Sequence, residues 1–314
     1  MRKPPCALII HGGAGAVGPA HERSPRRLAM MTAMKAGAAL LQAGGRALDA
    51  VIASVVILED DSLFNAGYGS TLNTDGAVEM DASVMVVEPS GEAHAGAVAA
   101  VTRVKNPIRL ARAVMETTPH VLMAGAGAER LARERSLQMC NPEDLVAPRA
   151  RERFLARVQR QAELAREAQG TVGAVALDIN GRLAAATSTG GVPGKLPGRI
   201  GDSAIIGAGT FANADAAASA TGHGEAIIMA SLCRETIAAI GEGGPTPAAR
   251  RKIAELIAPQ NCEAGIIMVD RRGRIGYAHN AETMEIAIFD ARGAMRHEWS
   301  APMRSLKPRG ARDK

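Results

Sequence analysis

Hydrophobic and polar positions alternate in blocks along the first half of the chain, and these blocks predict strands and helices in turn. The apolar run 7–10 predicts a buried strand. Ser24 and Pro25 predict a helix start, with serine as the cap and proline at the first helical position, and the helix is expected to end near Gly44. Its apolar face is predicted to carry Leu28, Met31, Met34 and Ala38. Further helices are predicted over 47–59, 108–116 and 124–134, and strands over 77–87 and 96–101.

The second half shows the same alternation with clearer turns. Strands are predicted over 172–178 and 182–187, joined by Asn180-Gly181, a pair typical of hairpin turns. A second hairpin is predicted over 264–269 and 274–279, and 284–289 is predicted as the last strand. Helices are predicted over 224–239 and from Thr246-Pro247 to 257. Because the strands come in hairpins between helical blocks, the pattern favours an α+β fold with antiparallel sheets over a doubly wound parallel sheet.

The length and composition fit one enzyme domain, and a chain of 314 residues could also form two. The 314 residues are 47% hydrophobic but only 2% aromatic, so alanine and glycine must fill much of the core. The net charge of +5 comes mainly from the tail 303–314, which holds five basic residues against one acidic residue and is expected to be solvated and disordered. Because aromatic side chains that could stack on bases are rare, nucleic acid is not an expected partner.

Cysteine spacing and terminal segments point to a reducing compartment. Cys6, Cys140, Cys233 and Cys262 lack metal-ligand spacing and are expected to be small buried residues. The apolar run after Met1-Arg2-Lys3 is too short for a signal peptide, and no stretch is long enough to span a bilayer, so we expect a cytoplasmic protein with no membrane partner. The segment 141–170 is rich in charged residues and is expected to be a flexible, partly helical linker.

Candidate chemistry begins at Thr171, which stands at the head of the apolar run 172–178. A mid-chain threonine hydroxyl is a poor nucleophile because no base lies beside it. Cleavage of the bond after Gly170 would give Thr171 an α-amine that could act as this base. A plain buried strand would explain the same run, so the run alone does not decide between the two.

Three later segments supply polar groups suited to a small zwitterion and an oxyanion. Thr189 precedes two glycines, Arg199 and Asp202 share one short loop, and Thr221-Gly222 precedes a predicted helix. The Arg–Asp pair could hold the two charges of an amino-acid head group, and donors at the helix start could stabilise an oxyanion. Each segment alone could also be an ordinary turn with Gly and Pro punctuation.

Taken together, these motifs resemble the plant-type L-asparaginases, or isoaspartyl peptidases, within the N-terminal-nucleophile hydrolases. The resemblance covers nearly the whole chain, because ordered motifs also occur in the first half: IHGGAG from Ile10, LFNAGYGS from Leu63, EMDA from Glu79 and PHVLM from Pro119. It implies a four-layer αββα sandwich formed by one domain, 1–314. It also implies that the chain cuts itself between Gly170 and Thr171, into 1–170 and 171–314.

The resemblance implies an amidohydrolase centred on Thr171. The Thr171 hydroxyl would attack the side-chain amide of L-asparagine, or the isopeptide bond of a β-aspartyl dipeptide, and form an acyl-enzyme that releases L-aspartate. Thr189 would orient the nucleophile. Asn65 would help to position the nucleophile and the cleavage region.

Five further residues match the family's substrate site. Arg199 would hold the substrate α-carboxylate with its planar fork, and Asp202 would hold the α-ammonium. Thr221 and the Gly222 amide would form the oxyanion hole, although Thr221 could also cap the following helix. Gly222 and Gly224 would line the head-group pocket.

A structural metal ion and a paired assembly are also implied. No organic cofactor is expected, but in the family a loop before Asn65 holds sodium through backbone carbonyls, which suit hard cations. The matching positions are Leu58, Glu59, Asp61, Phe64, Ala66 and Tyr68. A structural loop without an ion stays open as the alternative. The family also implies an (αβ)2 pair of cleaved protomers.

The chain departs from the family pattern around the oxyanion motif. His223 stands at a variable position, Phe211 replaces a frequent tyrosine, and the segment 213–220 is one residue short. The threonine mechanism needs no histidine, so His223 is predicted at the pocket rim or packed at the helix start. His11 and His279 are predicted to be structural.

Two other functions stay open at this point. One is a related enzyme that cleaves glycosylated asparagine, although the loop 191–199 fits the asparaginase pattern better. The other is a catalytically silent scaffold, against which the intact Thr171, Thr189 and Thr221 argue. The sequence leaves the preference between L-asparagine and β-aspartyl dipeptides undecided.

Overall fold

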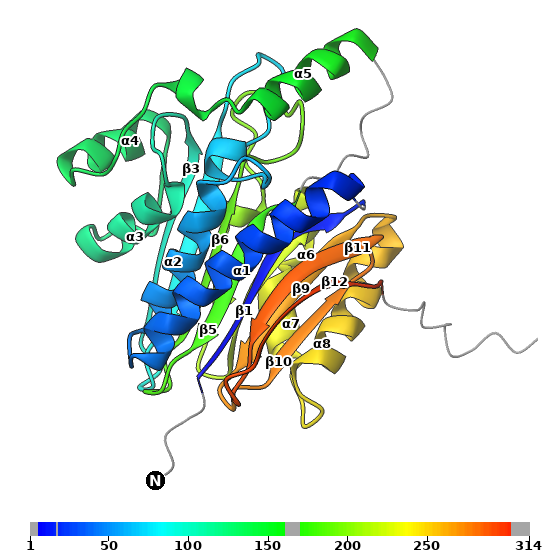
Figure 1. The fold of residues 1–314 in the computed structure, drawn as a ribbon. Helices are drawn as coiled ribbons and strands as arrows, with labels where there is room; N and C mark the ends of the chain where they lie inside the picture. The colour runs from blue at the N-terminus through cyan, green and yellow to red at the C-terminus, as the bar shows by residue number, and fades with distance from the viewer. Residues whose placement is uncertain (1–5, 17, 161–169, 303–314) are drawn as a thin grey trace, which may run out of the picture.

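Two β-sheets pack face to face at the centre of the molecule, in a computed structural model that describes residues 6–16, 18–160 and 170–302 (Figure 1). Within these ranges the larger sheet has the strand order β12-β11-β1-β5-β6-β2-β3-β4, and the smaller has the order β10-β9-β8-β7. Neighbouring strands are antiparallel except β3 and β4. The strands are β1 (Ala7–Gly15), β2 (Met80–Val87), β3 (Ala93–Val101), β4 (Leu122–Ala124), β5 (Val172–Leu177), β6 (Leu183–Thr189), β7 (Thr210–Ala212), β8 (Ala216–Gly222), β9 (Ala264–Asp270), β10 (Ile275–His279), β11 (Thr283–Phe289) and β12 (Met295–Ser300).

Helices cover the outer faces of both sheets, which gives the expected four-layer αββα sandwich. The first three helices pack on the larger sheet, and α7 and α8 pack on the smaller one (Figure 1). The helices are α1 (Ala20–Gln42), α2 (Ala47–Glu59), α3 (Pro107–Thr117), α4 (Gly125–Glu134), α5 (Pro148–Arg160), α6 (Gly224–Ala230), α7 (Leu232–Ala238) and α8 (Pro245–Lys252).

Alternation along the central strands divides the core into three apolar layers. Leu8 and Ile10 of β1 face the α1–α2 helices, whereas Ile9 between them faces the smaller sheet. On β9, Ile267 faces the larger sheet, and Ile266 faces α6–α8. Both faces of each sheet are therefore buried, and each fully buried isoleucine contributes about 1.5–3 kcal/mol. The predicted reliance on alanine holds, since all three layers contain many buried alanines.

Helix α1 begins earlier than the sequence pattern predicts. It starts at Ala20, so Pro25 lies inside the helix, and Ser24 is not its cap. The extra turn is held in place because Glu22 pairs with Arg149 of α5 at 2.6 Å. The predicted inward face is also wrong at one position: Leu28 is 71% exposed, and the neighbouring Ala29 and Met30 are buried instead.

Several elements of the second half differ from the prediction. The predicted helix 224–239 is broken at Ser231, whose φ of 46° ends α6 and precedes α7. The helix α8 starts at Pro245 and gives way to a π-turn over Ile253–Ile257. The strands β7 and β8 were not predicted, and β12, rather than 284–289, is the last strand of the described chain. Both predicted hairpins, β5–β6 and β9–β10, are present.

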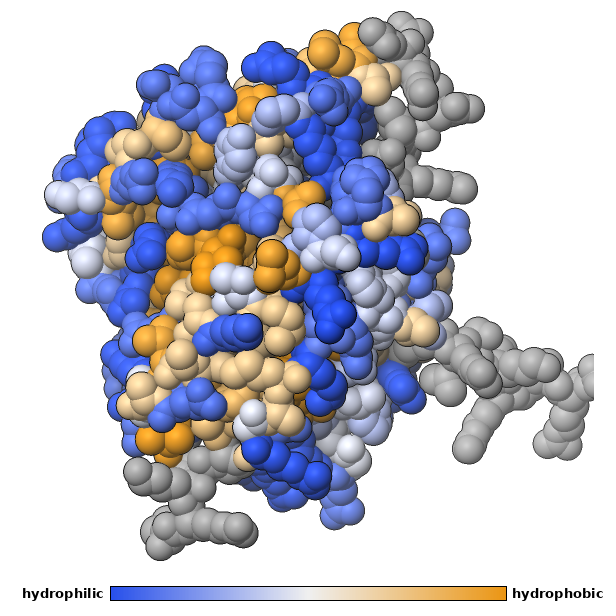
Figure 2. All heavy atoms as spheres, viewed as in Figure 1, coloured by the Kyte–Doolittle hydropathy of each residue, from blue (hydrophilic) through white to orange (hydrophobic). Residues whose placement is uncertain are grey.

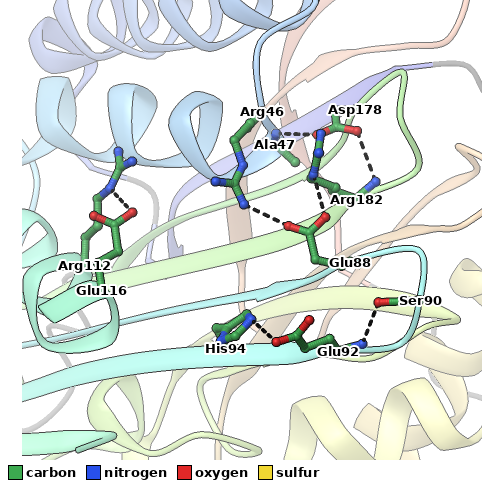
Figure 3. A network of polar contacts seen from close by, with 10 residues as sticks. All are labelled: Arg46, Ala47, Glu88, Ser90, Glu92, His94, Arg112, Glu116, Asp178 and Arg182. Carbon is green, nitrogen blue, oxygen red and sulfur yellow. Dashed lines mark hydrogen bonds and ion pairs between the residues drawn. The ribbon is translucent and has the colours of Figure 1, made fainter. Parts of the chain in front are cut away.

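A polar network ties the β5–β6 hairpin to the start of α2 (Figure 3). The Asp178 carboxylate accepts the backbone N–H of Ala47 at 3.0 Å, so it satisfies one of the free donors at the helix N-terminus. Arg182 pairs with Asp178 at 3.6 Å and with Glu88 at 2.7 Å, and Arg46 reaches Glu88 from the other side at 2.8 Å. Sheet and helix are thus joined at the end of the strands where β5 turns into β6.

The described part of the expected linker is helical and packed. Pro142–Leu145 forms a 3₁₀ turn and α5 follows, and Leu145 and Ala147 are buried against the helix-side layer. Residues 161–169 of the expected linker, and the expected disordered tail 303–314, lie outside the described residues.

The surface over α1 and α2 mixes apolar and charged side chains, as Figure 2 shows. Leu28 and Leu40 of α1 are among its exposed apolar residues. Among the described residues, no helix combines the length and the hydropathy needed to cross a bilayer.

Candidate active site

Thr171 and Thr189 lie together at one end of the β5–β6 hairpin. Thr171 immediately precedes β5, Thr189 ends β6, and the register pairs Val172 with Ser188. The Thr171 hydroxyl donates to the Thr189 hydroxyl across 3.1 Å, and Thr171 is only 7% exposed. The structure therefore brings the predicted nucleophile and its predicted partner within hydrogen-bond distance.

Gly170 is held against Gly13 of β1. A Cβ on either glycine would overlap the backbone of the other, so only glycine fits at both positions. Gly13 has a φ of +112°, a left-handed conformation that glycine adopts without strain, and it lies where the β1 register shifts between His11 and Ala14. The bond between Gly170 and Thr171 therefore lies against β1, just before β5 begins.

Asn65 forms hydrogen bonds with the segment that follows Thr189. Its Nδ2 donates to the Gly191 carbonyl at 2.6 Å, its Oδ1 accepts the Thr71 N–H at 2.9 Å, and its own carbonyl accepts the Gly190 N–H at 3.1 Å. The Gly191 N–H in turn donates to the Thr189 hydroxyl at 3.0 Å. Asn65 thus supports Thr189 through the backbone of the two glycines.

Thr221 and Gly222 end strand β8 beside this pair. Thr221 is fully buried, and its hydroxyl has no hydrogen-bond partner among the described residues. It does not cap α6, because the cap position is His223 and no side-chain cap bond is made there. Gly222 has a φ of +138°, and a side chain there would overlap the backbone of Glu263 and Ala264. A buried hydroxyl without a partner is available to donate to an oxyanion.

Arg199 and Asp202 form the charged part of the site. The Arg199 guanidinium donates from Nε to Glu225 at 2.9 Å. Complete burial raises the pKa of Asp202 to about 7, although the nearby Arg199 opposes the shift. One Asp202 carboxylate oxygen is buried and has no hydrogen-bond partner in the part of the chain that the structure describes. A Cβ on Gly224 would lie 2.6 Å from Arg199 Nη2 and 3.0 Å from Asp202 Oδ1, so the glycine leaves room for both side chains.

Asp81 supports this charged loop and was not predicted as a site residue. Its carboxylate accepts the N–H of Gly201 at 3.0 Å and that of Ala100 at 2.9 Å. Burial raises its pKa, and Lys195 opposes that shift. Glu79 also reaches the loop, where it accepts the Gly198 N–H at 3.0 Å. Both carboxylates belong to the motif EMDA. The motif was visible in the sequence, but the contacts of its carboxylates with this loop were not.

One cavity brings most of the predicted residues together. We call it the Thr171 cavity; it is lined by Ala14, Gly170, Thr171, Thr189, Gly191, Val192, Pro193, Arg199, Asp202 and Gly222. Asn65, Thr221 and Gly224 do not line it, although each lies next to residues that do. Val192 and Pro193 are lining residues that the sequence did not single out.

The loop expected to hold sodium forms a cradle of backbone carbonyls. A Cβ on Gly69 would lie 2.9 Å from the Ser62 carbonyl oxygen and 3.0 Å from that of Asp61, and it would overlap the Phe64 carbonyl. The Glu59 carbonyl likewise faces Gly67. No group of His, Cys, Asp or Glu in the described ranges is arranged to hold a metal. Hard oxygen donors converge here, so these residues fit an alkali cation.

Three histidines were singled out from the sequence, and one of them, His11, lies against the backbone of Thr171. His11 is fully buried, donates or accepts at Ser219 across 3.0 Å, and has a pKa lowered to about 3 by burial. His279 is buried and bonds the Ala281 carbonyl at 3.1 Å. His223 is half exposed at the start of α6, 3.7 Å from Glu225. Phe211 is partly buried and packs against both the apolar layer between the sheets and the layer under α6–α8.

The arrangement combines an acyl-transfer pair with a zwitterion site. Two threonine hydroxyls share a hydrogen bond, and a buried hydroxyl donor lies close by. A guanidinium and a carboxylate line the same cavity and match the carboxylate and ammonium of an amino acid. Such a site can position an amino-acid amide and transfer its acyl group to Thr171.

Comparison with known proteins agrees with this chemistry. The family model described as "Asparaginase" matches residues 4–297. The chain is 40% identical over 293 residues to the isoaspartyl peptidase of Escherichia coli (strain K12), covering 88% of this chain and 90% of that protein. It is 41% identical over 277 residues to the isoaspartyl peptidase/L-asparaginase of Bos taurus, covering 85% and 87%. It is 43% identical over 288 residues to a plant-type L-asparaginase of Pyrobaculum calidifontis, covering 88% and 94%.

Proposed function

Because the chain belongs to the asparaginase family, we propose that it is an autocleaving threonine amidohydrolase that acts on L-asparagine and β-aspartyl dipeptides and releases L-aspartate. It is a hydrolase of that family. The observation that carries the proposal is the Thr171 cavity, where Thr171 and Thr189 lie beside Arg199, Asp202 and the Gly170–Thr171 bond. The names of the relatives support hydrolysis of asparagine and isoaspartyl bonds.

The first proposed step is self-cleavage. The Thr171 hydroxyl attacks the Gly170 carbonyl, the C–N bond breaks, and the acyl group moves from nitrogen to the threonine oxygen. Water then hydrolyses this ester, which frees the Gly170 carboxylate and the Thr171 α-amine. The backbone of Gly13 fixes Gly170 in place for the attack. The new α-amine has a reference pKa of about 7.7–8.0, so it is partly neutral near neutral pH and can accept a proton.

The second proposed step is turnover. Arg199 and Asp202 hold the α-carboxylate and α-ammonium of the substrate, and the α-amine takes the proton of the Thr171 hydroxyl as it attacks the side-chain carbonyl. The oxyanion receives hydrogen bonds from the Thr221 hydroxyl and the Gly222 N–H. The amine leaves with a proton, water attacks the acyl-enzyme, and L-aspartate is released. Thr189 keeps the nucleophile oriented throughout.

The intact mass of the purified protein after incubation at neutral pH tests the proposal. We expect two fragments, 1–170 and 171–314, in the wild type and one uncut chain in Thr171→Ala. Hydrolysis of L-asparagine and of a β-aspartyl dipeptide should appear together with the cut. A conservative Thr171→Ser variant keeps a hydroxyl and should still cleave.

A single chain that stays uncut and hydrolyses neither substrate would overturn the proposal and favour the silent scaffold. The glycosylasparagine alternative is separated by the substrate: turnover of a glycosylated asparagine in preference to both proposed substrates would support it. Arg234→Gln, which lies outside the Thr171 cavity, serves as a control and should cleave and turn over normally.

We also propose a sodium ion in the carbonyl cradle of residues 58–68. The ion would supply positive charge that holds the carbonyls of Glu59, Asp61 and Phe64 together and keeps the following Asn65 in place. Thermal unfolding should occur at a lower temperature when sodium salts are replaced by salts of a large organic cation at equal ionic strength. An unchanged unfolding temperature would favour the ion-free loop.

A cytoplasmic pair of cleaved protomers, (αβ)2, completes the proposal. Its support is the membership in the family, and light scattering of the cleaved enzyme tests it. A mass of one cleaved protomer would contradict the pair.

A further inference from the structure

Arg26 of α1 joins three segments that lie far apart in the sequence. Its Nη2 donates to the Gly12 carbonyl of β1 at 2.9 Å, and its Nη1 donates to the Leu63 carbonyl in the loop before Asn65. Its Nε donates to the Glu285 carboxylate of β11 at 2.9 Å. Each of the three guanidinium nitrogens therefore has an acceptor, and the side chain is only 14% exposed.

The guanidinium is also held in one orientation. Its central carbon lies 4.4 Å from the centroid of the Phe64 ring and 5.8 Å from that of the Trp299 ring. Glu285 is held in turn by His297, whose Nε2 lies 2.9 Å from the other carboxylate oxygen. Because the guanidinium is a rigid planar fork, it holds the two carbonyls that it binds at a fixed separation.

The Gly12 carbonyl leads directly to the bond that is proposed to be cut. Gly12 precedes Gly13, whose backbone lies against Gly170. A Cβ on Gly12 would lie 3.0 Å from the Glu285 carboxylate, so this glycine leaves room for the partner of Arg26. Arg26 thus fixes the strand segment against which the proposed cleavage site lies.

The Leu63 carbonyl leads to the support of Thr189. Leu63 stands two residues before Asn65, whose hydrogen bonds hold the two glycines that follow Thr189. Arg149 also donates to the Leu63 carbonyl, at 3.4 Å. Arg26 adds the connection to β1, so that one side chain holds both this loop and the segment behind the proposed cleavage site.

We propose that Arg26 is a positioning residue for the self-cleavage, because it holds the Gly12–Gly13 segment, and with it Gly170, in place beside the Asn65 loop. One cavity contains all of these groups, and its lining includes Gly12, Gly13, Arg26, Leu63, Asn65 and Gly170. The inference rests on the proposed function of the Thr171 cavity. Arg26 does not line that cavity, so it is assigned no contact with the substrate.

The two proposed steps should depend on Arg26 to different extents. Before the cut, the Gly170 carbonyl must lie within reach of the Thr171 hydroxyl, and a misplacement of about 1 Å costs about 10²-fold in rate. During turnover the substrate is held instead by Arg199 and Asp202. The rate of self-cleavage is therefore the sensitive quantity, and KM for L-asparagine should not change.

The first-order rate constant of self-cleavage tests the assignment, in precursor made by cell-free synthesis and followed by intact mass. Arg26→Met removes the donors and should slow the cut about 10²-fold. Glu285→Gln keeps the bonds of Arg26 to the two carbonyls and should cut at nearly the wild-type rate. The double variant Arg26→Met, Glu285→Gln leaves no buried carboxylate without its cation and should cut as slowly as Arg26→Met. Arg26→Lys keeps the charge without the fork and should recover only part of the rate.

Arg112→Met is the control for a loss of stability. Arg112 pairs with Asp49 and with Glu116 at 2.8 Å each, in the helical layer that covers the larger sheet (Figure 3). Its loss should lower the unfolding temperature and leave the rate of the cut unchanged.

The outcomes separate this inference from the proposed function. A double variant that cuts at the wild-type rate would overturn the positioning role, and so would an equally slow cut in Glu285→Gln alone or in Arg112→Met. A raised KM for L-asparagine in the cleaved double variant would overturn it too, since the whole site would then be distorted. If the double variant does not fold, Arg26→Lys decides, because a wild-type rate there would overturn the role. A wild type that stays uncut would instead overturn the proposed function itself.

Discussion

Thr221 carries a buried hydroxyl that has no hydrogen-bond partner within residues 6–16, 18–160 and 170–302. A buried donor without a partner costs about 1–3 kcal/mol of stability, so a residue that keeps one serves some other purpose. The next residue, Gly222, lines the cavity where an oxyanion would form, so an oxyanion is the expected acceptor for this hydroxyl. At this one residue, a group that the proposed reaction needs lowers the stability of the folded chain.

Thr221→Val tests this trade. Valine keeps the shape and removes the donor, so kcat on L-asparagine should fall by about 10²–10³-fold. Thermal unfolding of the same variant should shift upward, because the orphan hydroxyl is gone. Thr187→Val is the matched control: the Thr187 hydroxyl donates to the Gly209 carbonyl at 3.0 Å, so its loss should lower the unfolding temperature. A Thr221→Val enzyme with normal kcat would contradict the oxyanion role.

Asp202 predicts a pH dependence of ligand binding. Burial raises its pKa to about 7 in the empty site, but it must be ionised to hold an α-ammonium group. The affinity for L-aspartate should therefore weaken as the pH falls below 7, approaching about tenfold per pH unit. Calorimetric titration of the cleaved enzyme on either side of pH 7 measures this.

The direction of the effect identifies the group. Protonation of the Thr171 α-amine would add positive charge near the bound side-chain carboxylate and strengthen binding at low pH, which is the opposite trend. Because the folded pKa of Asp202 is raised, its neutral form favours the folded state below pH 3.8, and this contribution is lost as the pH rises through about 7. An affinity that does not weaken at low pH would contradict the Asp202 assignment.

At the scale of elements, three hairpins share one turn design. Asp178, Asp270 and Asp290 each stand at or directly after the end of a strand, and each side chain accepts two N–H groups of the turn that follows. A glycine with positive φ completes each turn, at Gly181, Gly273 and Gly293. Only Asp178 also binds the first turn of a helix, through Ala47.

This difference gives a stability prediction within a Thr171→Ala background, which keeps the chain in one piece. Asp178→Ala loses the turn bonds and the α2 contact, so the free energy of unfolding in urea should fall by about 2–3 kcal/mol. Asp290→Ala loses only the turn bonds, and a loss of about 1 kcal/mol is expected. Equal losses in the two variants would show that the contact with α2 contributes nothing.

Local sequence predicts elements well where pattern and propensity agree. The helix α2 begins and ends at the predicted residues 47 and 59, because its apolar positions are regular and turn residues flank it. Strand β8 was missed because AAASATG is alanine-rich, and alanine is depleted in strands; its place between β7 and β9 decides its conformation. Edge strand β12 was missed because MRHEWS is mostly polar.

The candidate site was predictable only as far as its motifs carried it. The proposed roles of Thr171, Thr189, Arg199 and Asp202 came from short patterns around each residue. The contact of Asp81 with Gly201, 120 residues apart, and that of Arg157 with Pro193 join segments that no local pattern relates. Such contacts follow from the strand order, which the sequence pattern does not specify.

At the scale of the whole molecule, the two proposed fragments are interleaved in one sheet. Strand β1 of the fragment 1–170 lies between β11 and β5 of the fragment 171–314, and it is hydrogen-bonded on both edges. On the far side, β2 of the first fragment pairs with β6 of the second. Separation of the fragments would therefore break backbone ladders on both sides of β1 and beside β6.

The cleaved enzyme should consequently behave as one particle. The two fragments should elute together in size-exclusion chromatography and should separate only under denaturing conditions. Because cleavage breaks one bond and no ladder, thermal unfolding of the cleaved wild type should lie within a few degrees of that of uncut Thr171→Ala. Fragments that separate in dilute native buffer would contradict the interleaved sheet.

The contact of Gly170 with Gly13 makes the proposed cut depend on how the central sheet is assembled. Gly13 belongs to β1, which pairs with β5 and β11, two strands from the second half of the chain. The geometry proposed for the cut at Gly170 would therefore form only in molecules whose central sheet is complete. Self-cleavage would then occur only in correctly assembled molecules. The Thr171 nucleophile would be activated in these molecules, and misassembled molecules would stay inactive.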